Sequence, residues 1–309
     1  MTSQTDSIDI PLASAALQAK YDALKASIDR SDRAVVAFSG GIDSSLVAYV
    51  SGQVLGDRAV AVTSGSASLK RSDLELAQRL AEDWQLSHRV IYTNELQKAD
   101  YRANPVNRCF HCKTSLYEAL AKIAEEEGID TVFNGTNTDD LGDHRPGLIA
   151  ADNFNVRSPL IEAQFNKQDI RELAEHLGLE NAQKPQAACL SSRFPYGTAI
   201  DEAKLAQVED AEVFLEQLGF TQFRVRHHDT VARLELLPEQ FERAMRHNEL
   251  INQTLVGLGY SFVALDLKGF RSGALNETLQ RIDTVQIYDE THADSASEQP
   301  PYSGADRRL

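Results

Sequence analysis

One short stretch near the N-terminus constrains the fold more than any other part of this sequence. Apolar and β-branched residues fill positions 34–38, a composition typical of a buried strand. The run stops at Ser39-Gly-Gly-Ile-Asp-Ser44, after which Leu46, Val47 and Val50 recur at helical spacing. The sequence therefore predicts a strand, a glycine-containing loop and a helix, in that order.

Further strands and helices alternate along the first 185 residues. We expect strands at 58–63, 88–93, 131–134 and 156–160. Amphipathic helices separate them: one opened by a capping box of Ser72 with Glu75, one running from Thr114 to a stop at Gly128, and one capped by Asn166. This alternation indicates an α/β fold with a doubly wound parallel sheet, in which ligands bind at the carboxyl ends of the strands.

The pattern changes near residue 185. A helix through 205–218 precedes strands at 223–226, 231–236 and 262–267, with another helix before the last strand, which favours a smaller α+β domain. We therefore expect a first domain over 1–185 and a C-terminal α+β domain over 186–288 that binds substrate or builds a homo-oligomer. The polar segment 289–309 has the composition of a disordered tail.

Charge and hydropathy exclude several classes of function. The 309 residues include 31 Lys and Arg against 46 Asp and Glu, a net charge of −15. The basic residues are scattered singly, so we expect no stable binding of tRNA or DNA. No apolar run approaches the roughly 20 residues that cross a bilayer, and the N-terminus lacks the pattern of a secretory signal. The expected location is the cytoplasm, without a membrane partner.

The glycine-containing loop has the chemistry of a phosphate site. Gly40 and Gly41 allow backbone N–H groups to converge, the following helix N-terminus adds positive potential, and the serine hydroxyls can donate further hydrogen bonds. The lysine of a kinase-type P-loop is missing, so the loop suits holding pyrophosphate while AMP is transferred better than it suits transfer of a γ-phosphoryl group. The plainer alternative is a generic turn between a strand and a helix.

The loop also resembles the signature of a known superfamily. Ser-Gly-Gly-x-Asp-Ser after the first strand is similar to the PP-loop of N-type ATP pyrophosphatases, an adenine nucleotide alpha hydrolase-like fold. The resemblance implies that ATP is the cofactor and that a substrate is adenylated before a nucleophile displaces AMP. The residues that would bind ATP and its pyrophosphate are Ser39, Gly40, Gly41, Asp43, Ser44 and Ser45. Asp43, Asp139 and Asp140 are candidates to orient Mg²⁺, with capping of loops and helices as the alternative use.

Three cysteines suggest a metal site. Cys109 and Cys112 form a C-x-x-C pair, expected in a loop just before a helix, where nearby cations and the helix N-terminus would lower the pKa of the thiols. With Cys189 they can hold a 4Fe-4S cluster that leaves one iron without a protein ligand. The alternatives are a zinc site or three unrelated thiols. Zinc would need a fourth ligand, for which the candidates are His111, His88 and His144.

Longer blocks sharpen the resemblance to the LarE family of ATP-dependent sulfur transferases, which act in synthesis of the nickel-pincer nucleotide cofactor of lactate racemase. The similar blocks are Ser39–Ser44, Asn107–Lys113, Asn134–Gly147, Cys189–Gly197, Arg224–Arg226 and Gly269–Gly273, spread over nearly all of residues 15–285. In one branch of the family a single cysteine, at the position of Cys189, gives up its sulfur and becomes dehydroalanine. In the other, three cysteines bind a 4Fe-4S cluster. This chain resembles the cluster branch, with Cys189 at the active site.

The family resemblance implies a substrate, pyridinium-3,5-biscarboxylic acid mononucleotide. Its phosphate and two carboxylates call for guanidinium groups. The arginines in the similar blocks are Arg193, Arg224, Arg226 and Arg271. Arg224 and Arg226 share one face of a strand, and Glu235 matches an active-site acid of the family. A solvated strand face, on which Glu235 and Asp266 are surface partners, is the alternative.

These residues give a three-step hypothesis. ATP binds with Mg²⁺, a substrate carboxylate attacks the α-phosphate and releases pyrophosphate, and a sulfur nucleophile displaces AMP to leave a thiocarboxylate. Sulfide carried by the cluster is the expected nucleophile, supplied as sulfide or by a sulfur-donor protein. The rival functions are a cluster-dependent tRNA thiolase, a PP-loop amidoligase that uses ammonia, and a nucleotide-binding protein without catalysis.

Overall fold

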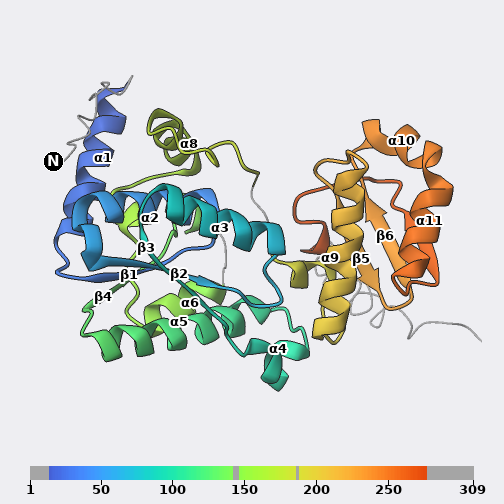
Figure 1. The fold of residues 1–309 in the computed structure, drawn as a ribbon, viewed down its shortest axis with the longest axis horizontal. Helices are drawn as coiled ribbons and strands as arrows, with labels where there is room; N and C mark the ends of the chain where they lie inside the picture. Colours follow the sequence, from blue (N-terminus) through green and yellow to red (C-terminus); the bar gives the residue numbers. More distant parts are fainter. Residues whose placement is uncertain (1–13, 142–145, 186–187, 277–309) are drawn as a thin grey trace, which may run out of the picture. The chain divides into compact units, whose positions relative to one another are not determined.

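The chain folds into two compact units, Met1–Val213 and Phe214–Leu309. The computed structural model describes residues 14–141, 146–185 and 188–276, so the tail predicted over 289–309 lies outside the described residues. Figure 1 shows the elements of both units. The domain boundary near residue 185 stays a prediction.

A parallel sheet of four strands forms the centre of the first unit. Its order is β3-β2-β1-β4, and every neighbouring pair is parallel. The strands are β1 (Ala34–Ala37), β2 (Ala59–Ser64), β3 (Ser87–Ile91) and β4 (Thr131–Phe133). They confirm four of the five strands predicted for this part of the chain and the α/β class with helices on both faces of the sheet (Figure 1).

Alternating side chains of the central strands build a core on each face of the sheet. Val36 and Ala61 point into one apolar cluster together with residues of α1, α2, α3 and α8. Val35 and Val60 point into the other, with residues of α5 and α6. Two-sided burial explains why β1 and β2 are continuous apolar runs without polar alternation. The helices are α1 (Ala15–Asp29), α2 (Ile42–Leu55), α3 (Arg71–Asp83), α4 (Ala99–Arg102), α5 (Arg108–Glu127), α6 (Pro146–Asn153), α7 (Pro159–Glu162) and α8 (Lys167–His176).

The strand order places a crevice beside β1. The chain runs outward from β1 through β2 to β3 and then crosses to β4 on the other side of β1. Such a reversal is where open parallel sheets bind their ligands, at the carboxyl ends of the strands. The Ser39–Ser44 loop follows β1 and the Asn134–Thr136 segment follows β4, so both lie at this point.

The structure tests four local expectations, of which two are wrong and two are confirmed. The strand predicted at 156–160 is wrong, because only an isolated bridge at Arg157 forms before Pro159 begins α7. The capping box at Ser72 is also wrong, since α3 is capped at Lys70 without a side-chain bond. By contrast, Asn166 caps α8 through a capping box, and Gly128 ends α5 in the left-handed conformation, both as predicted.

The second unit contains a three-stranded sheet in the order β5-β6-β7. β5 (Arg224–His228) and β6 (Val231–Glu235) form an antiparallel hairpin, and β7 (Phe262–Leu265) pairs with β6 in parallel. The parallel pair needs a crossover, which α10 (Phe241–Arg246) and α11 (Asn248–Gly257) provide. The α+β arrangement is confirmed. Helix α9 (Glu202–Gln217) spans the boundary between the units.

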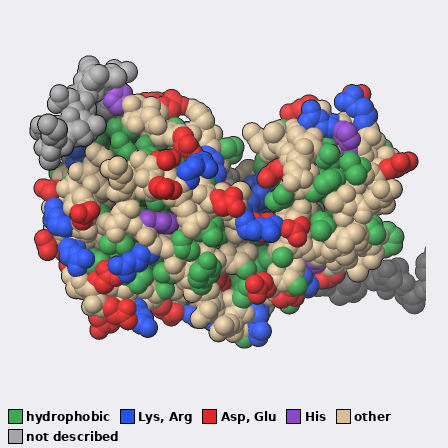
Figure 2. Space-filling model, in the orientation of Figure 1, with side chains coloured by type: hydrophobic (Ala, Val, Ile, Leu, Met, Phe, Trp, Pro, Cys, Tyr) green, Lys and Arg blue, Asp and Glu red, His purple; other side chains and the backbone are tan. Residues whose placement is uncertain are grey.

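The surface carries mixed charge. On the face that Figure 2 shows, Lys and Arg side chains lie singly or in small groups among Asp and Glu. None of the helices in the described part of the chain is long and apolar enough to cross a membrane.

We expect Asn166→Ala to lower the free energy of unfolding by about 1 kcal/mol, because it removes the side-chain oxygen that accepts from the Asp169 N–H at the start of α8. Urea denaturation measures the change. Ser14→Ala is the matched control: Ser14 occupies the same position before α1 but makes no capping bond, so a loss of equal size there would contradict the account.

Candidate functional site

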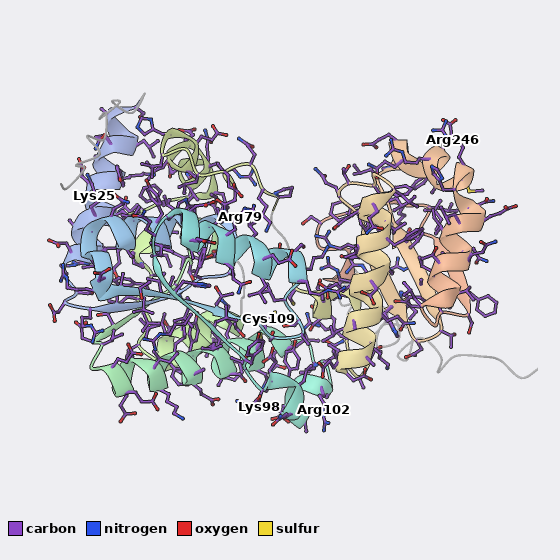
Figure 3. The ribbon with its side chains drawn as sticks, viewed as in Figure 1. Lys25, Arg79, Lys98, Arg102, Cys109 and Arg246 are labelled. Carbon is purple, nitrogen blue, oxygen red and sulfur yellow. The ribbon has the colours of Figure 1, made fainter. Side chains whose placement is uncertain are left out.

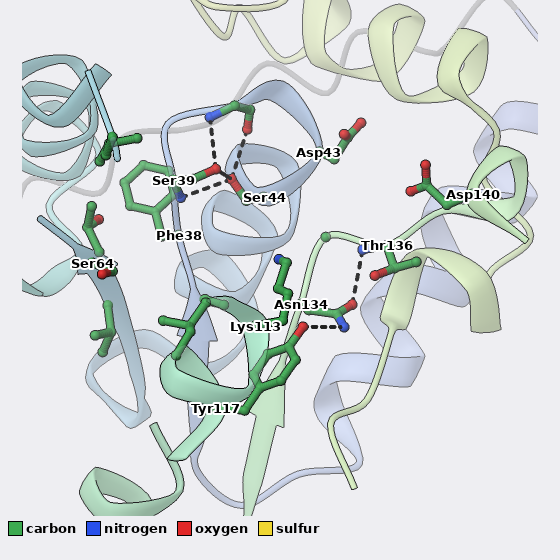
Figure 4. Close-up of a pocket in the computed structure, with 17 residues that line it drawn as sticks. Phe38, Ser39, Asp43, Ser44, Ser64, Lys113, Tyr117, Asn134, Thr136 and Asp140 are labelled. Atoms are coloured by element: carbon green, nitrogen blue, oxygen red, sulfur yellow. Dashed lines mark hydrogen bonds between the residues drawn. The ribbon is translucent and has the colours of Figure 1, made fainter. Parts of the chain in front are cut away.

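A cavity of about 300 Å³ opens where the strand order reverses, and the close-up in Figure 4 shows its lining. Its walls come from the carboxyl ends of β1, β2 and β4 and from the start of α5. The lining residues are Ala37, Phe38, Ser39, Gly41, Asp43, Ser44, Val62, Thr63, Ser64, Leu69, Lys113, Leu116, Tyr117, Asn134, Gly135, Thr136 and Asp140. One end is apolar and the other is a polar loop, which suits a ligand that joins a flat ring to a charged group.

The glycine loop wraps around the N-terminus of α2. The Ser39 N–H donates to Ser44 Oγ at 3.2 Å, the two serine hydroxyls lie 3.1 Å apart, and Ser44 Oγ donates to the carbonyl of Gly41 at 2.9 Å. Gly40 has a φ of +70°, which favours glycine. The loop is thus pre-shaped, with the positive end of α2 facing the cavity, as an anion site requires.

Gly135, in the segment after β4, lies directly against the backbone at the start of α2. A Cβ added there would lie 2.6 Å from the Ser44 backbone nitrogen and 2.9 Å from the Asp43 carbonyl carbon. These are backbone atoms that cannot turn aside, so only glycine allows the segment after β4 to touch the start of α2.

Acidic side chains surround the polar end of the cavity. Asp43 pairs with Lys167 at the start of α8, and the Lys167 N–H donates to Asp139 at 2.9 Å. Asp140 accepts from the Asn137 backbone and side chain within a capping box. Burial raises the pKa of Asp43 in spite of the lysine, and its Oδ1 is buried without a hydrogen-bond partner.

Ser45 lies behind the loop instead of lining the cavity. It is fully buried, and its Oγ accepts from Asn181 Nδ2 at 2.8 Å. The same nitrogen donates to the Gly40 carbonyl at 3.0 Å. Asn181, which the sequence analysis did not single out, therefore fixes the loop from its rear.

The cysteine pair lies within a helix. α5 begins at Arg108, so Cys109 and Cys112 occupy its first turns, and the loop predicted before Thr114 is wrong (Figure 3 labels Cys109). Asn107 precedes the helix and is a residue type common at this position, but it makes no side-chain capping bond. Cys189, from a distant segment of the same unit, precedes a short 3₁₀ turn, Leu190–Arg193.

The three thiols are close enough to influence one another. Burial raises the pKa of Cys112 to about 12, and the charges of Cys189 and Glu95 add to the effect. Cys109 is accessible to solvent, yet partial desolvation by the surrounding protein, followed by Cys189, also raises its pKa. The lowered pKa expected for the C-x-x-C pair is therefore wrong, because loss of water outweighs the nearby cations.

The described residues contain no ready-made metal site. No three His, Cys, Asp or Glu side chains in the described ranges are arranged to hold a metal ion. The possible zinc ligand His144 lies outside the described residues. His88 instead lies against Thr63, with its Nε2 2.9 Å from the threonine hydroxyl.

Arg193 supports the Cys189 segment from inside the unit. Its guanidinium is 1% exposed and forms two hydrogen bonds of 2.9 Å with Glu212. It also donates to the carbonyls of Ala188 and Cys189 at 2.6 and 3.0 Å. The structure places this side chain in a buried ion pair and not on the cavity wall.

The remaining candidate residues belong to the second unit. Arg226 and Arg233 pair with the fully buried Glu235 at 2.7 and 3.1 Å. Arg224 lies over the Phe270 ring at 5.1 Å, and Arg271 donates to the Gly269 carbonyl at 2.7 Å. Arg226, Glu235 and Arg224 thus lie in one small region of the β5–β6 hairpin, since Arg224 and Glu235 are register partners.

Sequence reasoning missed several polar residues of the first unit. Glu95 is 1% exposed with neither carboxylate oxygen hydrogen-bonded, and it lies near enough to Cys112 to affect its pKa. Lys113 lines the cavity, and Arg108 is buried. The positions of Arg108 and Lys113 beside the C-x-x-C pair were a usable signal, whereas Glu95 stands in no motif.

Comparisons with known proteins agree with this geometry. The asparagine synthase family model matches residues 18–142. The pyridinium-3,5-bisthiocarboxylic acid mononucleotide synthase of Lactiplantibacillus plantarum is 38% identical over 86% of this chain and 97% of its own length. An uncharacterised protein of Synechocystis is 43% identical over 86% of this chain and all of its own length. A tRNA sulfurtransferase of Desulfurococcus amylolyticus is 27% identical over 63% of this chain and 43% of its own length.

We expect Gly135→Ala to weaken ATP binding at least tenfold and to lower the free energy of unfolding by about 1–3 kcal/mol, because the new methyl group would push the Ser44 backbone away. Isothermal titration and urea denaturation measure the two effects. Gly257→Ala, where an added Cβ meets nothing within 4 Å, should leave ATP affinity unchanged and should not lower the free energy of unfolding, since alanine favours the helical conformation of α11. Unchanged ATP affinity in Gly135→Ala would contradict the close approach.

Unlike Gly135→Ala, a substitution at Asp43 should raise the free energy of unfolding at neutral pH. A carboxyl whose pKa is raised by burial binds its proton more readily in the folded chain, so it favours folding below the unfolded pKa of about 3.9 and opposes folding as the pH rises above it. We therefore expect Asp43→Asn to be more stable than wild type at pH 7, with the advantage shrinking towards pH 4. Urea titrations at both pH values test this against Asp152→Asn, an exposed carboxylate on α6. A variant less stable at pH 7 would refute it.

Proposed function

The chain belongs to the LarE family of ATP-dependent sulfur transferases, and from this we propose that it converts pyridinium-3,5-biscarboxylic acid mononucleotide into the bisthiocarboxylic acid mononucleotide, in nickel-pincer cofactor synthesis. The observation that carries the proposal is the cavity at the β1/β4 reversal, which combines a pre-shaped anion loop with apolar lining residues, in the unit that also carries all three thiols.

ATP occupies the cavity in this proposal. The apolar side chains near Phe38 and Leu116 take the adenine, and the Ser39–Ser44 loop takes the pyrophosphate through backbone N–H groups and serine hydroxyls. Lys113 on the cavity wall adds a positive charge that can face the phosphates. Ser45 acts indirectly, by anchoring the loop to Asn181.

Mg²⁺ fits the acidic end of the site. Asp43 has one carboxylate oxygen that is buried without a partner, and carboxylate oxygens are preferred ligands of this ion. Asp140 lies on the same cavity wall. These two residues would hold the ion, which would spread the charge of the phosphates, while Asp139 binds the Lys167 backbone.

The chemistry consists of two substitutions. First, an oxygen of a substrate carboxylate attacks the α-phosphorus of ATP, the bond to the β-phosphate oxygen breaks, and pyrophosphate leaves into the N–H groups of the loop. Second, a sulfur nucleophile attacks the activated carbonyl carbon, the C–O bond to AMP breaks, and a thiocarboxylate remains. Repetition at the other carboxylate gives the bisthiolated product. The sulfur comes from sulfide or from a donor protein.

Cys109, Cys112 and Cys189 are the residues that would hold a 4Fe-4S cluster. Their fit rests on the chemistry of the donor set: three thiols from two segments of the first unit, which the bond from Arg108 to the Ser191 carbonyl joins at 2.9 Å. When bound, such a cluster supplies an iron without a protein ligand, at which sulfide can be held. In this assignment Cys189 is a ligand and keeps its own sulfur.

The arginines of the second unit are assigned to the substrate phosphate. Arg224 and Arg226 lie two positions apart and therefore on the same face of β5. The ion pair with Glu235 fixes the direction of the Arg226 guanidinium. Arg271 joins them in the proposal. Arg193 has a supporting role, through its bonds to the Cys189 segment.

Anaerobically purified protein tests the function directly. Wild type, given ATP, Mg²⁺, substrate and sulfide, should form AMP, pyrophosphate and the thiolated product, and should hold about four irons per chain. Cys109→Ser should lose the iron and the thiolated product yet still release pyrophosphate. Asp43→Asn should keep the iron but lose pyrophosphate release.

Three other results of the same assay would each indicate one of the alternative functions. Product formation with ammonia in place of sulfide would indicate an amidoligase. Thiolation of tRNA and not of the mononucleotide would indicate a tRNA thiolase. Binding of ATP without pyrophosphate release, with every substrate offered, would contradict catalysis altogether.

A further inference from the structure

A buried polar contact joins the two segments that carry the cysteines. We call Asn104, Arg108 and Ser191 the clasp. Their exposed fractions are 0%, 4% and 0%. Arg108 Nη1 donates both to Asn104 Oδ1 and to the carbonyl of Ser191, the latter at 2.9 Å. One guanidinium nitrogen therefore links the residue before Cys109 to the turn that follows Cys189.

Further bonds surround the clasp. Asn104 Nδ2 donates to the Pro195 carbonyl at 2.7 Å, and the Gly197 N–H donates to the Asn104 carbonyl at 2.9 Å. Tyr101 Oη lies 2.6 Å from Ser191 Oγ. Asn104 has a φ of +53°, a left-handed conformation that asparagine tolerates better than most residues. The segment before α5 is thus shaped to present both its side chain and its backbone to the Cys189 segment.

Arg108 has no carboxylate partner within ion-pairing distance among the residues that the structure describes. A buried guanidinium without an anion is costly, because its solvation by water is lost. Its positive charge instead lies near Cys109, where it acts to lower the pKa of the thiol against the effect of burial. Elsewhere in the unit, the comparably buried Arg193 is paired with Glu212. Arg108 thus lacks a carboxylate partner at the place where it adjoins Cys109.

We propose that the clasp is a positioning device that holds Cys189 beside Cys109 and Cys112, with the Arg108 charge balancing the thiolates that these cysteines would become as cluster ligands. Its residues contact one another and the backbone of the Cys189 segment, so their part is to set the distance between two segments some 80 positions apart in sequence. The inference rests on the proposed function in giving the three thiols a common task and in making them anionic; the positioning of Cys189 does not depend on the cluster. The closeness of the thiols can be measured without any cluster.

Thiol–disulfide equilibrium tests the positioning. In a Cys109→Ser background the remaining cysteines are Cys112 and Cys189, so the ratio of disulfide to dithiol in glutathione buffers reports their effective concentration. We expect Asn104→Ala and Arg108→Met each to lower this ratio at least tenfold. Arg102→Met is the matched control: Arg102 is an exposed arginine on α4, and Figure 3 labels it. It should leave the ratio unchanged.

Thermal unfolding identifies any variant that fails to fold, and Asn104→Ala carries the test if Arg108→Met does so. A wild-type ratio in folded Asn104→Ala would overturn the positioning role.

Iron content separates this inference from the proposed function. If both hold, anaerobic wild type contains the cluster, and the clasp variants lose most of the iron while retaining pyrophosphate release. If wild type contains no iron but the disulfide ratio still falls in the clasp variants, the cluster assignment fails and the clasp stands. If wild type holds iron, and the clasp variants hold as much iron with the same visible absorption as wild type, the positioning role of the clasp is contradicted and the cluster assignment stands.

Discussion

The contact between the backbone at Gly135 and the start of α2 is the constraint on which the rest of the site depends. β4 reaches β1 from the opposite side to β2, and only a residue without a side chain lets its following segment touch Ser44. This contact brings the loop after β1 and the loop after β4 to one cavity. A parallel sheet with the same strands in another order would leave the two loops apart.

A second layer of polar residues fixes what that contact brings together. Asn181 binds the carbonyl of Gly40 and the hydroxyl of Ser45, so the anion loop is held from behind. Arg193 and Arg108 both donate to backbone carbonyls of the Cys189 segment, at Cys189 and at Ser191. In each case a buried side chain binds a backbone carbonyl of a loop or of a short 3₁₀ turn, which keeps that segment in one conformation where no sheet or long helix defines it.

The sequence was sufficient for the parts of the fold that depend on local pattern. The β1 strand, the loop at Ser39 and the cap at Asn166 follow from residue types within a few positions of one another. It failed where neighbours in space decide. Near 156–160 only a single bridge from Arg157 to Phe133 forms, and the C-x-x-C pair lies in a helix whose first residue follows Asn107 without a side-chain cap. The pairing of Arg193 with Glu212, 19 positions away, and the burial that raises the pKa of Cys112 depend on packing that no local pattern records.

The source of the transferred sulfur is the most direct test of the account. Anaerobic protein with its natural sulfur would be given ATP, Mg²⁺, the pyridinium mononucleotide and isotopically heavy sulfide, and both product and protein would be analysed by mass spectrometry. The account predicts heavy sulfur in the thiocarboxylates over several turnovers, with the mass of the Cys189 peptide unchanged. Light sulfur in the product, together with dehydroalanine at position 189 after a single turnover, would contradict it.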